Sequence, residues 1–183
     1  MANKLNFIPE EWATLLESTM VAGIAVSAAD PSGLWGTLKE FFANSSALDA
    51  AKRDPHSNEL VMAVIAAFDS EEGRGKLQKT LHKRFAEVAD PADFVQRSLV
   101  SLREASTILD ARAPGDAAAF KAWLFSVSQR VAEASTEGGF LGFGGVQVSD
   151  AERATLDDIA EALGIADQRD SGSVEPKPSA STR

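Results

Sequence analysis

The chain contains no cysteine, and this absence excludes several kinds of site at once. Disulfide bonds, iron–sulfur clusters, thiolate zinc sites and thiol nucleophiles all require cysteine. Histidine is scarce as well, because only His56 and His82 are present. Two histidines without cysteine leave too few ligands for an ordinary zinc site. The missing cysteines also fit a reducing compartment.

Long hydrophobic runs and an excess of basic residues are also missing. The uncharged stretch 18–29 has about 12 residues, whereas a membrane-spanning helix needs roughly 20. The N-terminal residues lack the pattern of a signal peptide. The formal net charge of −9 argues against nucleic-acid binding, which needs a basic face. We therefore expect a cytoplasmic protein of bacterial type, with no transmembrane segment, no membrane association and no bound nucleic acid.

The one glycine-rich stretch, GGFLGFGG at 138–145, lacks both common phosphate-binding patterns. A P-loop needs a lysine after its last glycine, and Val146 follows here. The dinucleotide fingerprint fails on its spacing, and no strand precedes it. No Gly-x-Ser-x-Gly nucleophile elbow occurs in the chain. We identify no catalytic residue and favour a non-enzymatic protein, with an acidic active site as a rival interpretation.

Amphipathic helical patterns cover most of the chain. In the first of them Trp12, Leu15, Leu16, Thr19 and Met20 recur at the three- and four-residue spacing of one helical face. Similar patterns predict helices at 9–29, 34–43, 58–68, 70–88, 91–111, 114–135 and 150–163. No segment alternates for long with period two. The sequence therefore predicts an all-α bundle of six or seven helices.

Several helix boundaries carry their own signals. Asp90 before Pro91 is an N-cap with proline at the first helical position. Ser149 and Glu152 have the spacing of a capping box, and Gly164 suits a helix end. Beyond it, residues 167–183 are rich in serine, proline and charge. We expect a single helical domain over 1–166 and a disordered tail over 167–183.

The two ends of the domain share a plan that suggests an internal duplication of a helical hairpin. In each, an apolar helix containing Trp and Leu ends in small residues and a carboxylate, Asp30 or Glu137. Glycine follows, and a second carboxylate lies in the next helix, at Glu40 or Glu152. Residues 9–43 and 117–164 are therefore expected to pack as similar units.

The second of these hairpins resembles the tellurite-resistance TerB-like helical family. The residues that carry the resemblance are Glu137-Gly138 and the helix entry GVQVSDAE at 145–152. The match is best over 120–164 and weaker over 9–43. It departs from the family pattern at Glu137, where aspartate is usual, and in the insert 140–144. The resemblance implies an all-helical fold, a non-enzymatic role in bacterial stress or toxic-anion resistance, and divalent-cation binding.

Carboxylates flank the turns of both hairpins, and they form the candidate metal site. Hard cations such as Ca²⁺ or Mg²⁺ take several oxygen ligands, and a glycine loop between carboxylates can fold around one. The candidate ligands are Asp30, Glu40, Glu137, Asp150 and Glu152. A second interpretation holds for two of them, because acidic residues in the first turn of a helix are favoured by its dipole and its cap.

Three questions stay open on the sequence alone. The loop 138–145 either packs Phe140 and Phe143 into the core or presents them to a protein partner or a membrane. The whole chain, in turn, is either a cation-binding protein or a metal-independent interaction module with exposed aromatics such as Trp35 and Phe42. We expect an unidentified protein partner in either case. The basic cluster is either a solvated face or a docking patch, and it comprises Lys76, Lys79, Lys83 and Arg84.

Overall fold

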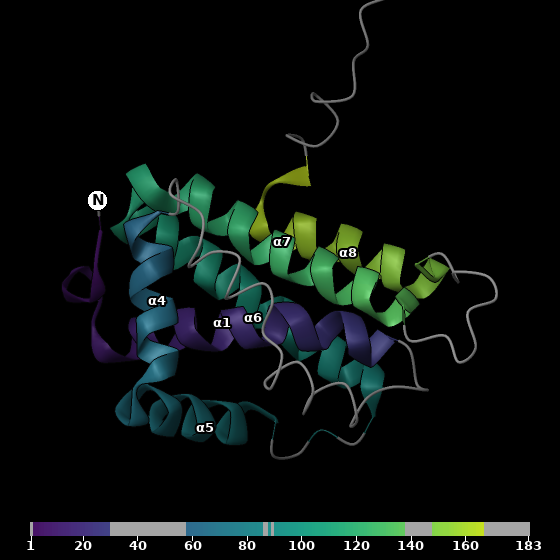
Figure 1. Ribbon diagram of the computed structural model, residues 1–183, viewed down its shortest axis with the longest axis horizontal. Coiled ribbons are helices and arrows are strands. Elements are labelled where there is room, and N and C mark those ends of the chain that lie inside the picture. Colours follow the sequence, from purple (N-terminus) through teal and green to yellow (C-terminus); the bar gives the residue numbers. More distant parts are fainter. Residues whose placement is uncertain (1, 30–57, 86–87, 89, 138–147, 167–183) are drawn as a thin grey trace, which may run out of the picture.

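The computed structural model describes residues 2–29, 58–85, 88, 90–137 and 148–166. These residues form one short 3-10 helix and six α-helices, and none of them lies in a strand. The elements are η1 (Lys4–Asn6), α1 (Pro9–Ala29), α4 (Glu59–Asp69), α5 (Glu71–Phe85), α6 (Pro91–Arg112), α7 (Pro114–Glu137) and α8 (Asp150–Leu163) (Figure 1). The predicted all-α fold is confirmed. The helix predicted at 34–43, the glycine loop at 138–145 and the tail lie outside the described residues.

The predicted helix ends are formed by the residues that the sequence indicates. Asp90 accepts a hydrogen bond from the backbone N–H of Asp93 at 2.9 Å. The Ser149 hydroxyl accepts from the Glu152 N–H at 3.2 Å, and the Glu152 carboxylate accepts from the Ser149 N–H at 2.8 Å. Gly164 ends α8 in the left-handed conformation, with φ 69°. These contacts satisfy backbone groups that the helix itself leaves without partners.

α1 is the central helix of the bundle. It packs against α4, α5, α6, α7 and α8, and every residue from Leu15 to Val26 is buried. The apolar face predicted from the spacing is indeed buried, but the opposite face is buried as well. The prediction of a single buried face was therefore incomplete. A helix covered on all sides carries small and apolar residues around its whole circumference, as at Val21, Ala22 and Ala25.

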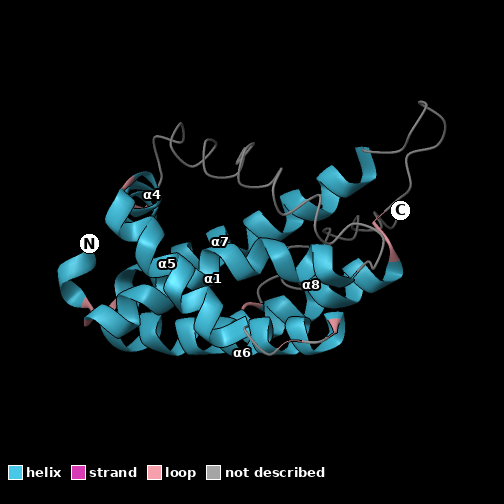
Figure 2. Cartoon of the chain, turned by 90° about the horizontal axis from the view of Figure 1, so that it is seen from below, coloured by secondary structure: helices cyan, strands magenta, loops and turns pink. Residues whose placement is uncertain are grey.

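Two hydrogen bonds show that α1 and α7 run side by side in the same direction. The Ala2 N–H, shortly before α1, donates to Asp116 at the start of α7 at 2.6 Å. Farther along, the Ser128 hydroxyl of α7 donates to the Ala22 carbonyl of α1 at 2.8 Å. α6 runs the opposite way, since Arg112 at its end pairs with Glu11 at the start of α1. The two views agree that α4 stands at the N-terminal end of this bundle (Figures 1 and 2).

α4 and α5 meet in a tight elbow at Ser70. The Ser70 hydroxyl donates to the Ala67 carbonyl at 2.8 Å and accepts from the Gly73 N–H at 3.0 Å. Gly73 lies so close to α4 that a Cβ atom there would come within 2.0 Å of the Ala67 carbonyl oxygen. Only glycine fits at this position. The elbow fixes the start of α5 against α4, whose Leu60 and Val64 belong to the core.

The described helices leave the predicted duplication untested, but they do bear on the absence of a membrane-spanning helix. α1 and α7, the first helices of the two proposed units, pack against each other. The second helix of the N-terminal unit lies outside the described ranges, so the duplication stays a prediction. Within the described ranges no helix combines the length and the hydropathy needed to cross a membrane.

Candidate functional site

The helices that lead to the predicted metal ligands converge on one end of the bundle. From Ala22, opposite Ser128, α1 continues for about 10 Å to Ala29, and α7 continues from Ser128 for about 14 Å to Glu137. α8 begins at the same end and runs back along the bundle (Figure 1). Asp30 is the residue that directly follows α1. The chain segments carrying Asp30, Glu137, Asp150 and Glu152 thus start from one end of the molecule.

The five predicted metal ligands differ in their exposure and in how much of each the structure describes. Asp150 is fully exposed and pairs with Arg153 at 3.1 Å. Glu152 is buried and holds the capping box of α8, which is the structural role that the sequence offered as the alternative. Asp30 and Glu40 lie outside the described residues, and of Glu137 only the helical backbone is described. Within the described part of the chain, no three acidic or histidine side chains gather closely enough to hold a metal ion.

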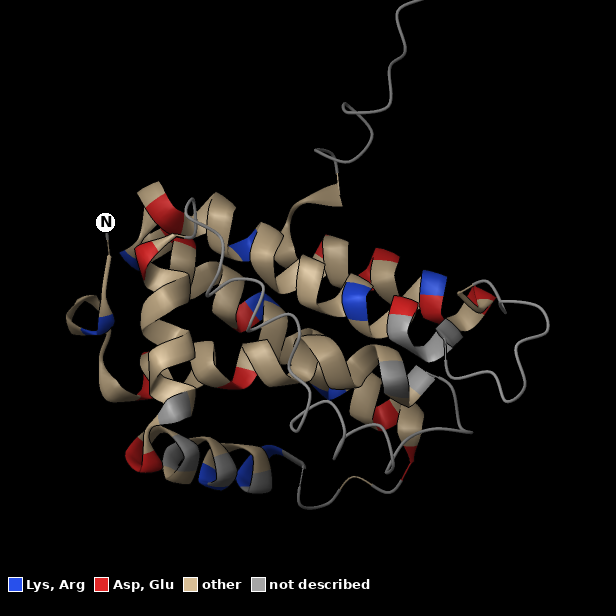
Figure 3. Cartoon of the chain, in the orientation of Figure 1, with Lys and Arg blue, Asp and Glu red and all other residues tan. Residues whose placement is uncertain are grey.

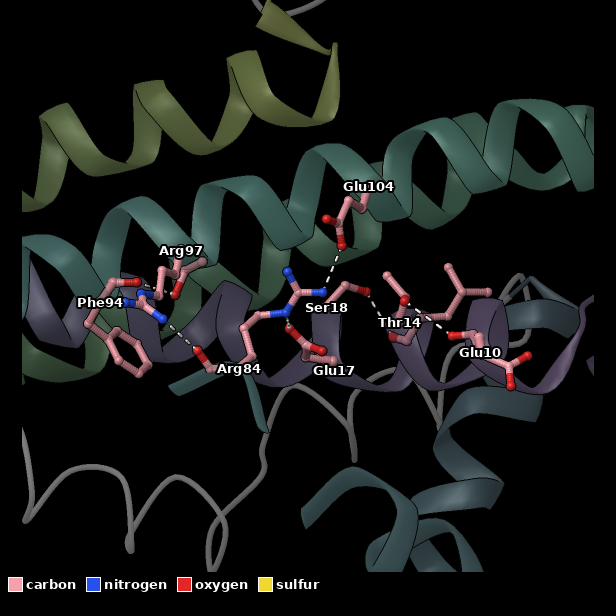
Figure 4. A network of polar contacts seen from close by, with 10 residues as sticks. Glu10, Thr14, Glu17, Ser18, Arg84, Phe94, Arg97 and Glu104 are labelled. Carbon is pink, nitrogen blue, oxygen red and sulfur yellow. Dashed lines mark hydrogen bonds and ion pairs between the residues drawn. The ribbon is translucent and has the colours of Figure 1, made fainter. Parts of the chain in front are cut away.

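A second polar site, which the sequence analysis missed, lies where α5 crosses α1 and α6. The guanidinium of Arg84 pairs with Glu17 of α1 through Nε and with Glu104 of α6 through Nη2, the latter at 2.7 Å (Figure 4). Arg97 of α6 donates to the backbone carbonyl of Arg84 at 3.1 Å. Arg97 itself is held by Asp93 one turn earlier. One arginine therefore joins three helices.

Glu17 is the unusual member of this network because its carboxylate has no exposure to solvent. Neither of its oxygens, nor the buried hydroxyl of Ser101, has a partner in good hydrogen-bond geometry. Burial raises the pKa of Glu17, and the like charge of Glu104 acts in the same direction. The Ser101 hydroxyl and the Arg84 guanidinium favour the charged form, yet desolvation outweighs them and the pKa stays raised.

An open pocket brings solvent to the outer side of this network. An open pocket of about 300 Å³ lies on the outer surface between α5 and α6, and its lining includes Arg84, Gln96, Arg97 and Val100. Glu104 is half exposed on the same helix as Val100. The Arg84 side chain therefore separates a fully buried carboxylate from bulk water.

Arg84 differs from the other described members of the basic cluster on α5 that the sequence indicates. Lys79 and Lys83 are exposed on α5, as the solvated-face interpretation expects, whereas Arg84 is partly buried and pairs with Glu17. Figure 3 shows acidic positions at the start of α5 and basic positions farther along it. A signal for the buried partner was present in the sequence. Glu17 is the only charged residue between Trp12 and Ala29, in a helix that is otherwise apolar or small. A lone charge in such a stretch indicates a buried polar contact.

Comparisons with known proteins leave the chain without an assigned family. No family model matches it, and neither curated proteins nor solved structures show a match. The TerB-like resemblance therefore rests on the sequence pattern of 120–164 and, more weakly, of 9–43.

Proposed function

We propose that this chain is a non-enzymatic cation-binding protein of TerB-like type, which binds Ca²⁺ or Mg²⁺ at the end of the bundle where α1 and α7 finish and α8 begins. The observation that supports the proposal is the parallel course of α1 and α7. It gives segments more than 100 residues apart in sequence, those of Asp30 and Glu137, a common starting point. Ligands from several segments are what a hard cation requires.

The exposed carboxylate of Asp150 is the best-placed described ligand. Its contact with Arg153 joins two exposed side chains, and such surface pairs contribute little, so a cation can displace the arginine. Glu152 is a weaker candidate because its carboxylate already accepts from the Ser149 N–H. Asp30, Glu40 and Glu137 would supply the remaining oxygen ligands.

Calorimetric titration of the full chain with Ca²⁺ and with Mg²⁺ tests this proposal. We expect a saturable heat with at least one cation, and a rise in Tm of several degrees at about a hundredfold excess over Kd. The variant Glu137→Gln with Asp150→Asn should lose both signals. Asp158→Asn provides the matched control, since it removes an exposed carboxylate from the same helix two turns away. Wild-type protein without heat or Tm shift for either cation would leave the metal-independent interaction module as the better account.

The stress-response role follows from the resemblance and has its own test. Expression of the chain in a tellurite-sensitive bacterium should raise the tellurite concentration that stops growth. The Glu137→Gln, Asp150→Asn variant should not, provided that it is expressed at the same level. Cation binding without protection would retain the binding function and reject the tellurite-resistance role.

A further inference from the structure

α5 is the described helix with the thinnest apolar attachment. Its sequence, EEGRGKLQKTLHKRF, is mostly charged or polar. Gly73 and Leu77 are the only α5 residues that are buried, among those whose burial the structure describes. Both lie in its first half, next to the elbow with α4. In its second half, half-buried Leu81 packs against the core, so among the described residues the apolar packing there is weaker than in the first half.

Polar contacts of Arg84 add to the packing of Leu81 in holding that second half. Its side chain pairs with Glu17 and Glu104, and its backbone carbonyl accepts from Arg97 (Figure 4). A helix fastened through a buried ion pair is closely balanced, because the cost of removing charges from water nearly cancels their attraction. Changing the charge of one partner can shift this balance.

Glu17 is the partner whose charge can change. When α5 packs against α1 and α6, the Glu17 carboxylate is shielded from solvent and its oxygens lack well-formed hydrogen bonds. When the end of α5 moves away, water reaches Glu17 and solvates the ionised form. Ionisation of Glu17 therefore favours the open arrangement, whereas the protonated form is compatible with the closed one. In the closed, protonated state Arg84 keeps its ion pair with Glu104.

We propose that Glu17 and Arg84 form a pH-sensitive latch, which holds the C-terminal end of α5 against α1 and α6 in acid and loosens it as the pH rises. The pocket at Gln96 and Val100 lies on the outer side of Arg84 and gives water its approach. Opening would uncover Glu17 and Ser101 between α1 and α6.

The pH range follows from the direction of the pKa shift. In the open state Glu17 titrates near the ordinary glutamate value of 4.5, and in the closed state its pKa is higher. The free energy needed to open the end of α5 therefore falls as the pH rises from 4.5 to the raised pKa. Above the raised pKa this free energy no longer changes with pH. The groups that act on Glu17 are Arg84 of α5 with Ser101 and Glu104 of α6; among the described residues, α4, α7 and α8 contribute none. Arg97 and Asp93 act one step away, through the Arg84 carbonyl.

Hydrogen exchange of the full chain between pH 4.5 and 8, followed by mass spectrometry and corrected for intrinsic exchange rates, tests the latch. In the wild type, protection at the C-terminal end of α5 should fall several-fold as the pH rises, while the interior of α6 stays unchanged. Glu17→Gln mimics the protonated acid and should keep α5 protected at every pH. Arg84→Met keeps the aliphatic stem and should leave α5 weakly protected throughout.

Two controls separate the latch from other titrations. Glu104→Gln removes the half-exposed carboxylate from the same arginine, and it should loosen α5 while the pH dependence remains. His82→Gln tests the nearby histidine of α5 and should also retain that dependence. Protection of α5 that does not vary with pH in the wild type, or an unchanged pH dependence in Glu17→Gln, would overturn the proposal. The Glu17→Gln result decides even if Arg84→Met fails to fold.

Discussion

At the scale of single residues, Glu17 illustrates a charge that costs the folded protein stability. The carboxylate is fully buried, and its nearest polar neighbours do not compensate for the lost water. The raised pKa of Glu17 means that the folded protein accommodates the neutral acid better than the carboxylate, so a neutral group of the same shape should suit this site better than the charge does. Glu11, a partly exposed carboxylate, shows the reverse, because its pKa is lowered chiefly by the hydrogen bond from Arg112.

Glu17→Gln should therefore raise the stability of the protein at pH 7, by on the order of 1 kcal/mol or about 2–4 °C in Tm, because Arg84 is partly exposed and keeps Glu104 as its partner. A raised folded pKa means that the folded state binds its proton more tightly than the unfolded state does. The cost of Glu17 is thus fully present above the raised pKa and disappears as the pH falls toward 4.5. Thermal melts of both proteins at pH 4.5 and pH 7 measure this. A variant less stable than wild type at pH 7 would show that the ion pair with Arg84 dominates.

Asp116 is a residue of the opposite kind, because its buried carboxylate is well supplied with donors. It accepts from the Ala2 N–H at 2.6 Å and from the Asn58 side-chain amide at 2.8 Å. Asn58 in turn caps α4. Asp116→Ala should destabilise the protein by about 2–3 kcal/mol, since it removes hydrogen bonds to a charged acceptor and leaves buried donors without it. Urea unfolding measures the change, and Asp158→Ala on the exposed face of α8 should stay within about 0.5 kcal/mol of wild type.

At the scale of elements, two glycines in α5 should respond oppositely to the same substitution. Gly73→Ala places a Cβ against the Ala67 backbone, where neither side can give way, and should destabilise the elbow by about 3 kcal/mol. Gly75 has nothing within 4 Å of the same atom. Gly75→Ala should therefore stabilise by about 0.5–1 kcal/mol through helix propensity. Chemical denaturation of the two variants checks both signs, and a stabilised Gly73→Ala would contradict the close approach.

The same elbow shows which features of the fold could be read from the sequence. Helix spans and ends depend on neighbouring residues, so the spacing around Asp90, Ser149 and Gly164 was sufficient to predict them. In the sequence, Gly73 and Gly75 look equally like weak points in the first turn of a helix. Only the approach of α4 distinguishes them, and such an approach depends on tertiary packing.

The two candidate sites also differ in how far the sequence could indicate them. The carboxylates of the candidate metal site were selected because they flank turns, and as a set they stay a prediction; of the two whose side chains are described, Glu152 serves the cap of α8. The Arg84 network was not predicted, because Glu17, Arg84 and Glu104 are far apart in the chain. The lone charge at Glu17 marked one member, and no local pattern identified its partners.

At the scale of the whole molecule, residues 167–183 are expected to contribute nothing to the core. They contain few apolar side chains, so they have little surface to bury against the helices. Deleting them should leave the Tm unchanged within about 1 °C, since so few apolar side chains are removed with them. Differential scanning calorimetry of the 1–166 fragment and the full chain provides the measurement. A loss of several degrees would show that the tail docks on the helices.

The parallel course of α1 and α7 also has a consequence for synthesis on the ribosome. The contacts that fix α1 reach across the chain, with sequence separations of 114 for Ala2 with Asp116 and 106 for Ala22 with Ser128. At about 5–20 residues per second, the ribosome needs roughly 5–20 s to deliver α7 after α1 has emerged. During that interval α4, α5 and α6 become available to α1, but α7 and α8, which cover the rest of it in the folded protein, do not. Nascent chains should therefore recruit chaperones early, and the protein should complete its fold only late in translation.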